Sequence, residues 1–237
     1  MDSKDLTAKE HAEVFLQLFE MDETLCLQYI NTHTDFYDVV MEGDDGNQST
    51  VFLQTCFDMK ENLILEMIKN GANIHALDKY NYGAMDSLCF RGHKQAAEKL
   101  IEMKYNLNQK NGCNTTPLIT AIYCDENDCA LLLIKNGIDV NITNHMNETA
   151  LQVACDKTIK NETIAIELIR HGAEFINIID THIAYNELDK LSAFIREIYN
   201  KQLSDVVAIK DANSAVDKCF GQFEMKHFVK LFCEYII

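Results

Sequence analysis

The chain has little proline, glycine or tryptophan: its 237 residues include one proline, nine glycines and no tryptophan. Proline and glycine dominate flexible linkers and low-complexity segments, so a chain this poor in them has little room for either. No stretch stays apolar for the roughly 18 residues that a membrane-spanning helix needs. The polar start, MDSKDLTAKEHAE, lacks the apolar core of a secretory signal. We therefore expect a soluble, intracellular protein located in the cytoplasm.

Positive charge is also scarce, because 21 Lys and Arg residues stand against 37 Asp and Glu residues, for a formal net charge of −16. Such a charge opposes binding to nucleic-acid phosphates and to anionic membrane surfaces, and we expect neither as a partner. It would attract a basic segment or helix of another protein. The alternative is that the acidity only keeps the protein soluble.

The sequence contains no glycine-rich phosphate loop, no HExxH motif and no nucleophile elbow, so we expect no enzymatic activity and no cofactor. Its nine cysteines are an odd number without a CxxC pair, which favours reduced thiols. Cys113, Cys124 and Cys129 lie close in sequence, with His145 further along, but their spacing does not suit a closed zinc site. We predict no metal site, and we expect Cys129 to be a core residue.

What the sequence does contain is a repeated pattern, which is clearest between Asn111 and Asn144. Thr116 and Pro117 predict the start of a short apolar helix, because threonine caps helices and proline at the first helical position loses no hydrogen bond. A second helix is expected over residues 128–135. Gly137 would end it, since the residue after a helix often takes a left-handed backbone.

The same signals recur along the chain at one constant spacing. The residues expected to open the first helices are Thr50, Gly83, Thr116 and Thr149. The residues expected to end the second helices are Gly71, Lys104, Gly137 and, displaced by a short insertion, Gly172. An early position of each turn holds Gln48, Asn81, Asn114 or Asn147. Asparagine tolerates a positive φ better than most residues other than glycine, so three of these four positions suit a left-handed turn.

This pattern resembles the ankyrin-repeat family, whose repeat of about 33 residues is a β-turn followed by two antiparallel helices. The resemblance implies an all-α solenoid of helix-turn-helix units with β-turn or hairpin loops and helical caps. The histidine position of the family's Thr-Pro-Leu-His motif holds, in the four copies, Leu53, Asp86, Ile119 and Gln152. We expect a single domain over 1–237, composed of a capping repeat (1–44), four repeats (45–77, 78–110, 111–143 and 144–177) and a degenerate repeat with a helical cap (178–237).

The two ends are less regular than the middle. Apolar spacing predicts one helix after Thr7 and a second that carries Leu25, Leu27, Tyr29 and Ile30. Towards the other end, the spacing predicts a helix over 183–198 and two more near 203–219 and 224–236. A solenoid cannot leave its last apolar face open, so we expect these helices to cap the stack.

The resemblance also implies where a partner would bind, because the turn tips and the exposed end of the first helix line the concave face of such repeats. At the helix-end position the chain has Phe57, Phe90 and Tyr123, each one repeat length after the last. The other candidate partner-binding residues are Lys79, Tyr80, Tyr82, Arg91, Cys113, His145 and Met146. Aromatic residues and arginine are enriched at binding hot spots. The alternative is that the aromatic rings fold back and complete the core.

Cysteine precedes the helix-end position in three copies, as Cys56, Cys89 and Cys155. Cysteine is small and readily buried, so we expect all three to pack in the core.

The resemblance favours a non-enzymatic, monomeric protein–protein interaction module that binds its partner in the concave groove. Inhibitory ankyrin proteins that bind a transcription factor's localisation region are a precedent for a regulatory inhibitor. One alternative is a substrate-receptor adaptor for a ubiquitin ligase, with the C-terminal helices as the docking element; another is self-assembly through an end face. Abundant Asn, Ile and Lys suggest an AT-rich genome, and a viral or bacterial origin would place the protein in a host cytoplasm with host factors as targets.

Overall fold

The computed structural model describes residues 6–19, 21–42, 46–57, 60–156, 158–175 and 188–208, with backbone alone at 200 and 202–208. Within these residues the chain is mostly helical, and its only strands are the pair β1 (Val40–Glu42) and β2 (Gln48–Thr50). No helix of this described part is long and apolar enough to span a membrane. The chain forms two compact units, Met1–Val153 and Ala154–Ile237.

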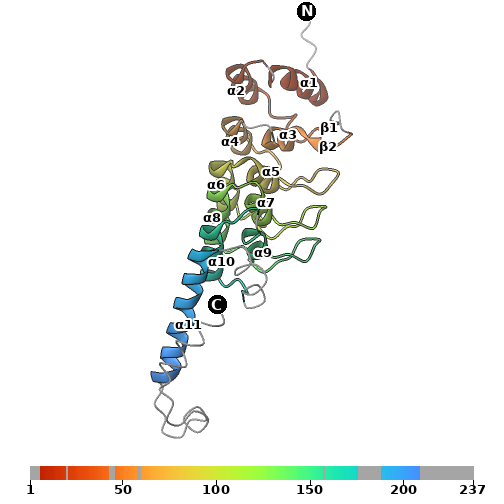
Figure 1. The fold of residues 1–237 in the computed structure, drawn as a ribbon. Helices are drawn as coiled ribbons and strands as arrows, with labels where there is room; N and C mark the ends of the chain where they lie inside the picture. The colour runs from red at the N-terminus through yellow and green to blue at the C-terminus, as the bar shows by residue number, and fades with distance from the viewer. Residues whose placement is uncertain are drawn as a thin grey trace, which may run out of the picture. The chain divides into compact units, whose positions relative to one another are not determined.

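The first unit is built from consecutive helix pairs. The pairs are α1 (Ala8–Phe19) with α2 (Glu23–Thr32), α3 (Val51–Phe57) with α4 (Glu61–Lys69), α5 (Ala84–Arg91) with α6 (Lys94–Glu102), and α7 (Pro117–Tyr123) with α8 (Asn127–Lys135). First helices α3, α5 and α7 pack side by side, as do second helices α4, α6 and α8 (Figure 1). A further short helix, α9 (Ala150–Ala154), spans the boundary between the two units. The all-α repeat architecture expected from the sequence is confirmed.

The first helices begin where the repeat register predicts. Thr116 caps α7 by accepting a hydrogen bond from the Ile119 amide at 3.4 Å, and Pro117 is the first helical residue. Thr50 Oγ1 accepts from the Leu53 amide at 3.2 Å in the same way. Each cap satisfies one amide that has no partner inside its helix, which stabilises the helix start.

The second helices α4, α6, α8 and α10 are each followed by a left-handed residue, also as expected. The residues with positive φ at these ends are Gly71 (+94°), Lys104 (+63°), Gly137 (+80°) and Gly172 (+91°). The next residue then donates back across the last turn, as Ala72 does to the Met67 carbonyl at 3.0 Å. This arrangement satisfies a carbonyl that the helix itself leaves open.

The N-terminal helix pair is held by buried aromatic residues. Phe15 and Phe36 are fully buried, with ring centres 5.0 Å apart. The Tyr37 hydroxyl donates to the Ile30 carbonyl at 2.8 Å. Leu25 lies on α2 as expected but is 44 % exposed, because α2 turns the neighbouring Cys26 into the core.

The predicted cysteine packing is confirmed, since Cys56, Cys89 and Cys155 are each fully buried. Cys129 is buried as well, on α8. The first hairpin departs from the expected register, because Gln48 lies in β2 and the left-handed residue of that turn is Gly46, with φ +72°.

In the second unit, α10 (Glu162–Arg170) packs against α11 (Asp189–Ala208). Leu191 and Ile195 of α11 are buried, and the Leu191 amide donates to Glu162 Oε2 at 2.8 Å. The predicted break between residues 198 and 203 was wrong, because α11 runs through it without a proline or glycine to stop the helix. The helix expected at 224–236 lies outside the described residues.

Candidate functional site

Three hairpin loops of the first unit are closed by the same side-chain geometry. Asp78 Oδ1 accepts hydrogen bonds from the amides of Tyr80 and Tyr82 at 2.8 and 2.7 Å. Asn111 and Asn144, at the same position of the next two repeats, each accept two amides of their own loops at distances between 2.9 Å and 3.1 Å. Such side-chain-to-backbone bonds hold a turn in one conformation, so the loop tips are fixed before any partner arrives.

Asparagine occupies the left-handed position of each of these loops, as the sequence indicates. Asn81, Asn114 and Asn147 have φ of +61°, +57° and +61°. The predicted role of these three residues is confirmed, and it follows from the unusual tolerance of asparagine for this conformation.

Neighbouring loops are also joined through their backbones. The Lys79 amide donates to the Gln48 carbonyl at 2.9 Å, and the Gly112 amide donates to the Tyr80 carbonyl at 2.8 Å. A Cβ on Gly112 would overlap the Tyr80 carbonyl oxygen, so the close approach of the two loops requires glycine there. The loops therefore form one continuous wall beside the first helices.

The row of aromatic residues at the ends of the first helices is partly exposed. The exposed fractions are 46 % for Phe57, 42 % for Phe90 and 47 % for Tyr123. The rings of Phe57 and Phe90 stack, with centres 5.3 Å apart and planes 16° from parallel. The Tyr123 hydroxyl donates to Glu148 Oε2 at 3.1 Å. These rings thus keep nearly half of their surface in contact with solvent.

Arg91 holds the first two rings together. Its Nε donates to the Phe57 carbonyl at 2.6 Å, and its guanidinium carbon lies 4.4 Å from the Phe57 ring centre and 5.2 Å from that of Phe90. A guanidinium over an aromatic face is attracted to the ring electrostatically. The aromatic pair is therefore ordered in the free protein.

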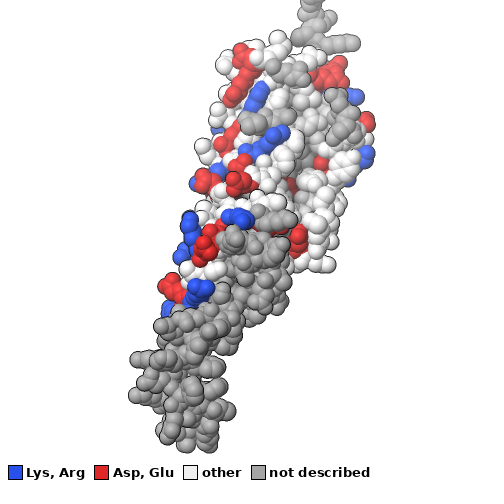
Figure 2. Space-filling model, in the orientation of Figure 1, with Lys and Arg blue, Asp and Glu red and all other residues white. Residues whose placement is uncertain are grey.

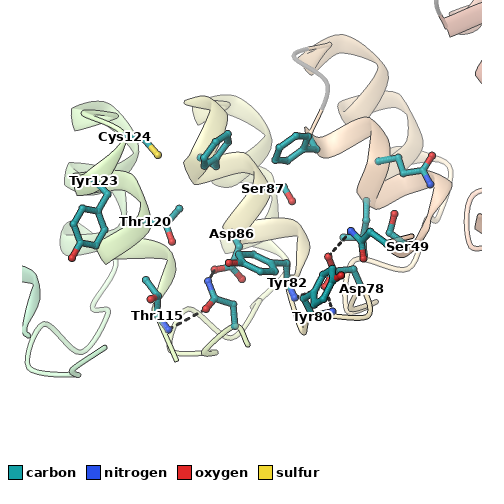
Figure 3. Close-up of a pocket in the computed structure, with 16 residues that line it drawn as sticks. Ser49, Asp78, Tyr80, Tyr82, Asp86, Ser87, Thr115, Thr120, Tyr123 and Cys124 are labelled. Carbon is teal, nitrogen blue, oxygen red and sulfur yellow. Dashed lines mark hydrogen bonds between the residues drawn. The ribbon is translucent and has the colours of Figure 1, made fainter. Parts of the chain in front are cut away.

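A groove of about 800 Å³ lies between the loops and the first helices (Figure 3). Five of the ten candidate partner-binding residues line it: Phe57, Tyr80, Tyr82, Phe90 and Tyr123. The turn-tip residue Asn47, also expected at the groove, lines it too. Ten other lining residues were not expected from the sequence: Ser49, Leu53, Gln54, Asp78, Asp86, Ser87, Asn111, Thr115, Thr120 and Cys124. Most of these are small or polar, and no hot-spot argument from composition selects them.

The remaining five candidates lie outside this lining. Lys79 is exposed, and its ammonium donates to the Gly46 carbonyl at 3.2 Å, while Arg91 is bound to Phe57 as described.

Cys113, at the tip of the next loop, accepts a hydrogen bond from the Tyr82 hydroxyl at 3.3 Å. That hydrogen bond is the main cause, and burial the second, of a pKa for Tyr82 that is raised to about 12. The loop-tip residues His145 and Met146 are exposed, and one His145 ring nitrogen lies 3.1 Å from the Cys113 carbonyl.

Asp86 is the buried acid of the groove. Only 2 % of its surface is exposed, and burial, its largest influence, raises its pKa to about 7. Hydrogen bonds from the Gly83 amide (3.3 Å) and Asn111 Nδ2 (3.2 Å) oppose that shift, while the negative charge of Asp78 adds to it. Only one feature of the sequence could have singled out Asp86: it is acidic, whereas the same repeat position holds Leu53, Ile119 or Gln152 in the other copies.

Charge is distributed differently elsewhere on the first unit. Figure 2 shows acidic and basic residues mixed on the side of the second helices. There Lys69 pairs with Glu66, and Lys99 with Glu102, each at 2.8 Å. Such exposed pairs contribute little to stability, and they leave this side nearly balanced in charge.

Within the described residues, no three His, Cys, Asp or Glu side chains gather in a way that could hold a metal ion. The groove therefore presents aromatic faces, hydroxyl and amide groups and two carboxylates. These groups suit recognition of a polypeptide segment by burial and hydrogen bonding.

Comparison with known proteins places these features in a family. A family model described as "Ankyrin repeats (3 copies)" matches residues 52–144 and, in an overlapping match, residues 84–180, together more than half of the chain. Alpha-latrotoxin-Lg1a of Latrodectus geometricus is 40 % identical over 70 residues, which are 28 % of this chain. Inversin of Mus musculus is 40 % identical over 67 residues (28 % of this chain), and inversin of Danio rerio is 31 % identical over 77 residues (32 %).

These matches cover 5 %, 6 % and 8 % of the respective relatives. The chain thus spans less than a tenth of the length of the curated relatives that it matches. The similarity concerns the repeats, and the activities of those much longer proteins are not carried over to this chain.

Proposed function

The chain belongs to the ankyrin-repeat family, a family of protein–protein interaction modules, and on that premise we propose that it binds a partner protein through the groove between its hairpin loops and first helices. The observation that carries this proposal is the set of five aromatic residues lining one groove: Phe57, Tyr80, Tyr82, Phe90 and Tyr123. Aromatic side chains bury a large area at a small cost in conformational entropy, so they dominate the binding energy of many interfaces.

The rigidity of the groove supports the same proposal. The loops are closed by Asp78, Asn111 and Asn144, and the Phe57–Phe90 pair is held by Arg91. A preorganised site loses less entropy on binding than a mobile one, which raises its affinity for a given contact area. We expect the partner to offer a basic segment or helix, because the groove contains two carboxylates and the chain carries a net charge of −16.

Substitution of the groove aromatics tests the proposal. The full chain would first be used to capture partners from its native cell, with identification by mass spectrometry. We then expect Phe90→Ala and Tyr123→Ala each to weaken binding of the purified partner by about tenfold or more, because each removes a hot-spot ring. Their melting temperatures should stay close to that of the unchanged chain, since both rings are nearly half exposed.

Met103→Ala is the matched control, because Met103 is an exposed apolar residue (43 %) that does not line the groove. It should leave the affinity unchanged. Equal losses from Met103→Ala and Tyr123→Ala, or large unfolding effects in both aromatic variants, would reject the groove as the binding site.

Within this proposal the protein acts by occupying its partner rather than by catalysis, as a cytoplasmic regulatory inhibitor. If the chain comes from a virus or a bacterium, the partner would be a host protein. Family membership supports binding in general, and the specific role follows only from the identity of the captured partner.

The adaptor for a ubiquitin ligase remains the alternative proposal. It depends on residues 178–237, of which the structure describes 188–208, and α11 is the described element there. Co-purification of a cullin or an elongin with the full chain, lost on deletion of residues 209–237, would favour the adaptor. Capture of the partner without either protein would favour simple binding.

A further inference from the structure

The loop at Asp78 is closed by a carboxylate, whereas the loops of the next two repeats are closed by neutral side chains. Its Oδ1 accepts the amides of Tyr80 and Tyr82, and its Oδ2 accepts from Asn47 Nδ2 at 3.0 Å. At the corresponding positions, Asn111 and Asn144 accept two loop amides each with a neutral side chain. The turn therefore requires a side-chain oxygen and not a carboxylate.

Asp86 likewise caps the start of its helix, a role that the side-chain amide of Gln152 has in a later repeat. Its Oδ2 accepts the amide of Gly83 at the start of α5, and Gln152 Oε1 accepts the amide of Thr149 at the same position of a later repeat, at 2.8 Å. A buried carboxylate is costly to keep charged, so the cap alone gives no reason for an acid. The turn and the helix start thus each need one acceptor oxygen, while the second oxygens of Asp78 and Asp86 accept from Asn47 and Asn111.

These two acids border the same part of the groove. Figure 3 shows Asp78, Tyr80 and Tyr82 on one loop and Asp86 on the adjoining first helix, α5. Among the described residues that line the groove, none is a lysine or an arginine. The two cations that contact lining aromatics already donate to backbone carbonyls: Lys79 to Gly46 and Arg91 to Phe57.

We propose that this part of the groove is a subsite for one lysine or arginine side chain of the partner, which pairs with Asp86 beside the rings of Tyr80 and Tyr82. This inference rests on the proposed function, because it specifies what the partner places in the groove. Asp78 strengthens the negative potential there. Since Asp86 is almost wholly buried, a cation meets it in a poorly hydrated setting, where opposite charges attract more strongly than at the surface.

Binding at this subsite is coupled to loss of a proton. Asp86 has a pKa of about 7, so near neutral pH a large share of the free protein carries it protonated. The titratable groups that act on Asp86 or feel its charge are Asp78, Tyr82, Tyr105 and Cys89. A bound cation favours the ionised form of Asp86, and the affinity therefore rises with pH.

The experiment starts from random short peptides displayed on phage and selected on the immobilised full chain. We expect the selected peptides to share a lysine or arginine at one position and to lose binding to Phe90→Ala. In one synthetic peptide, replacing that residue by glutamine should weaken binding by about 10- to 100-fold, the range for a hydrogen bond to a charged group.

Charge-removing variants then place the effect at the subsite. Asp86→Asn and Asp78→Asn should each weaken the lysine or arginine peptide and leave the glutamine peptide almost unchanged. Asp139→Asn is the matched control, because Asp139 accepts its own loop amide (Asn141, 3.0 Å) but does not line the groove. If Asp86→Asn fails to fold, Asp78→Asn carries the test, since Asn111 and Asn144 show that asparagine serves at that position.

The pH dependence completes the test. Between about pH 6 and pH 8, affinity for the basic peptide should rise with pH, and calorimetry in two buffers should show proton release on binding. Asp86→Asn should remove both effects. Peptides that need Phe90 but carry no shared basic residue would overturn this inference and leave the proposed function standing, whereas selection of no groove-dependent peptide would count against both.

Discussion

At the scale of single residues, Gly83 and Tyr105 show how one repeat departs from the others. Gly83 stands where three other repeats have threonine, and Tyr105 stands where Ala72 and Ile138 lie. A Cβ on Gly83 would lie 2.5 Å from the Tyr105 hydroxyl oxygen, which is too close for any side chain. The two departures are therefore linked, since the larger tyrosine occupies the space that the threonine would need.

Substitution at Gly83 should show this linkage. We expect Gly83→Ala to lower the free energy of unfolding by about 1–3 kcal/mol, because it forces Tyr105 to move within a packed core. The same change in a Tyr105→Phe background should cost clearly less, since the clashing oxygen is gone. Chemical denaturation of the four proteins measures the difference, and strictly additive effects would show that the two residues do not interact.

The sequence was a good guide to residues whose role depends on local backbone geometry. Asn81, Asn114 and Asn147 could be assigned a left-handed conformation because the preference of asparagine acts within the turn itself. The role of Asp86 could not be recognised, because it arises from burial and from the approach of Asn111 and Asp78, which belong to two different loops. Contacts that only the folded chain brings together leave no local signal.

At the scale of helices and loops, α4, α6, α8 and α10 share one way of ending, and α6 ends with the least suitable residue. Lys104 follows α6 with a φ of +63°, whereas Gly71 and Gly137 serve at the equivalent ends of α4 and α8. An L-residue with a side chain is strained in this conformation and glycine is not. The end of α6 is therefore a place where the fold is not optimised.

Replacing Lys104 by glycine should stabilise the protein by about 0.5–1 kcal/mol, because the relief of strain outweighs the extra freedom of glycine in the unfolded chain. Gly137→Ala, the reverse change at an equivalent position, should destabilise it by a similar amount. Both effects can be read from urea midpoints at an unchanged slope. A loss of stability in Lys104→Gly would refute the assigned backbone role.

The regular helices could be predicted because capping residues mark their starts and ends at the same positions of successive repeats. The break expected between 198 and 203 was wrong because apolar spacing alone suggested it, and no proline or glycine there stops α11. Loop side chains were only partly predictable. Tyr80 and Tyr82 line the groove and Lys79 on the same loop does not, a difference set by how the hairpin turns each side chain.

At the scale of the whole molecule, the first unit has two different sides. One side carries the second helices, with mixed and mutually paired charges. The other carries the groove, with half-exposed aromatics and two acids. We propose that a partner protein binds on the groove side.

Site-specific photo-crosslinking to the purified partner shows which side of the first unit the partner contacts. A benzophenone amino acid would replace Tyr123 in the groove or, in a second sample, Met103 outside it, since both residues are exposed and both variants should fold. We expect a crosslink to the partner from position 123 and none from position 103. A crosslink from position 103 with none from position 123 would contradict it.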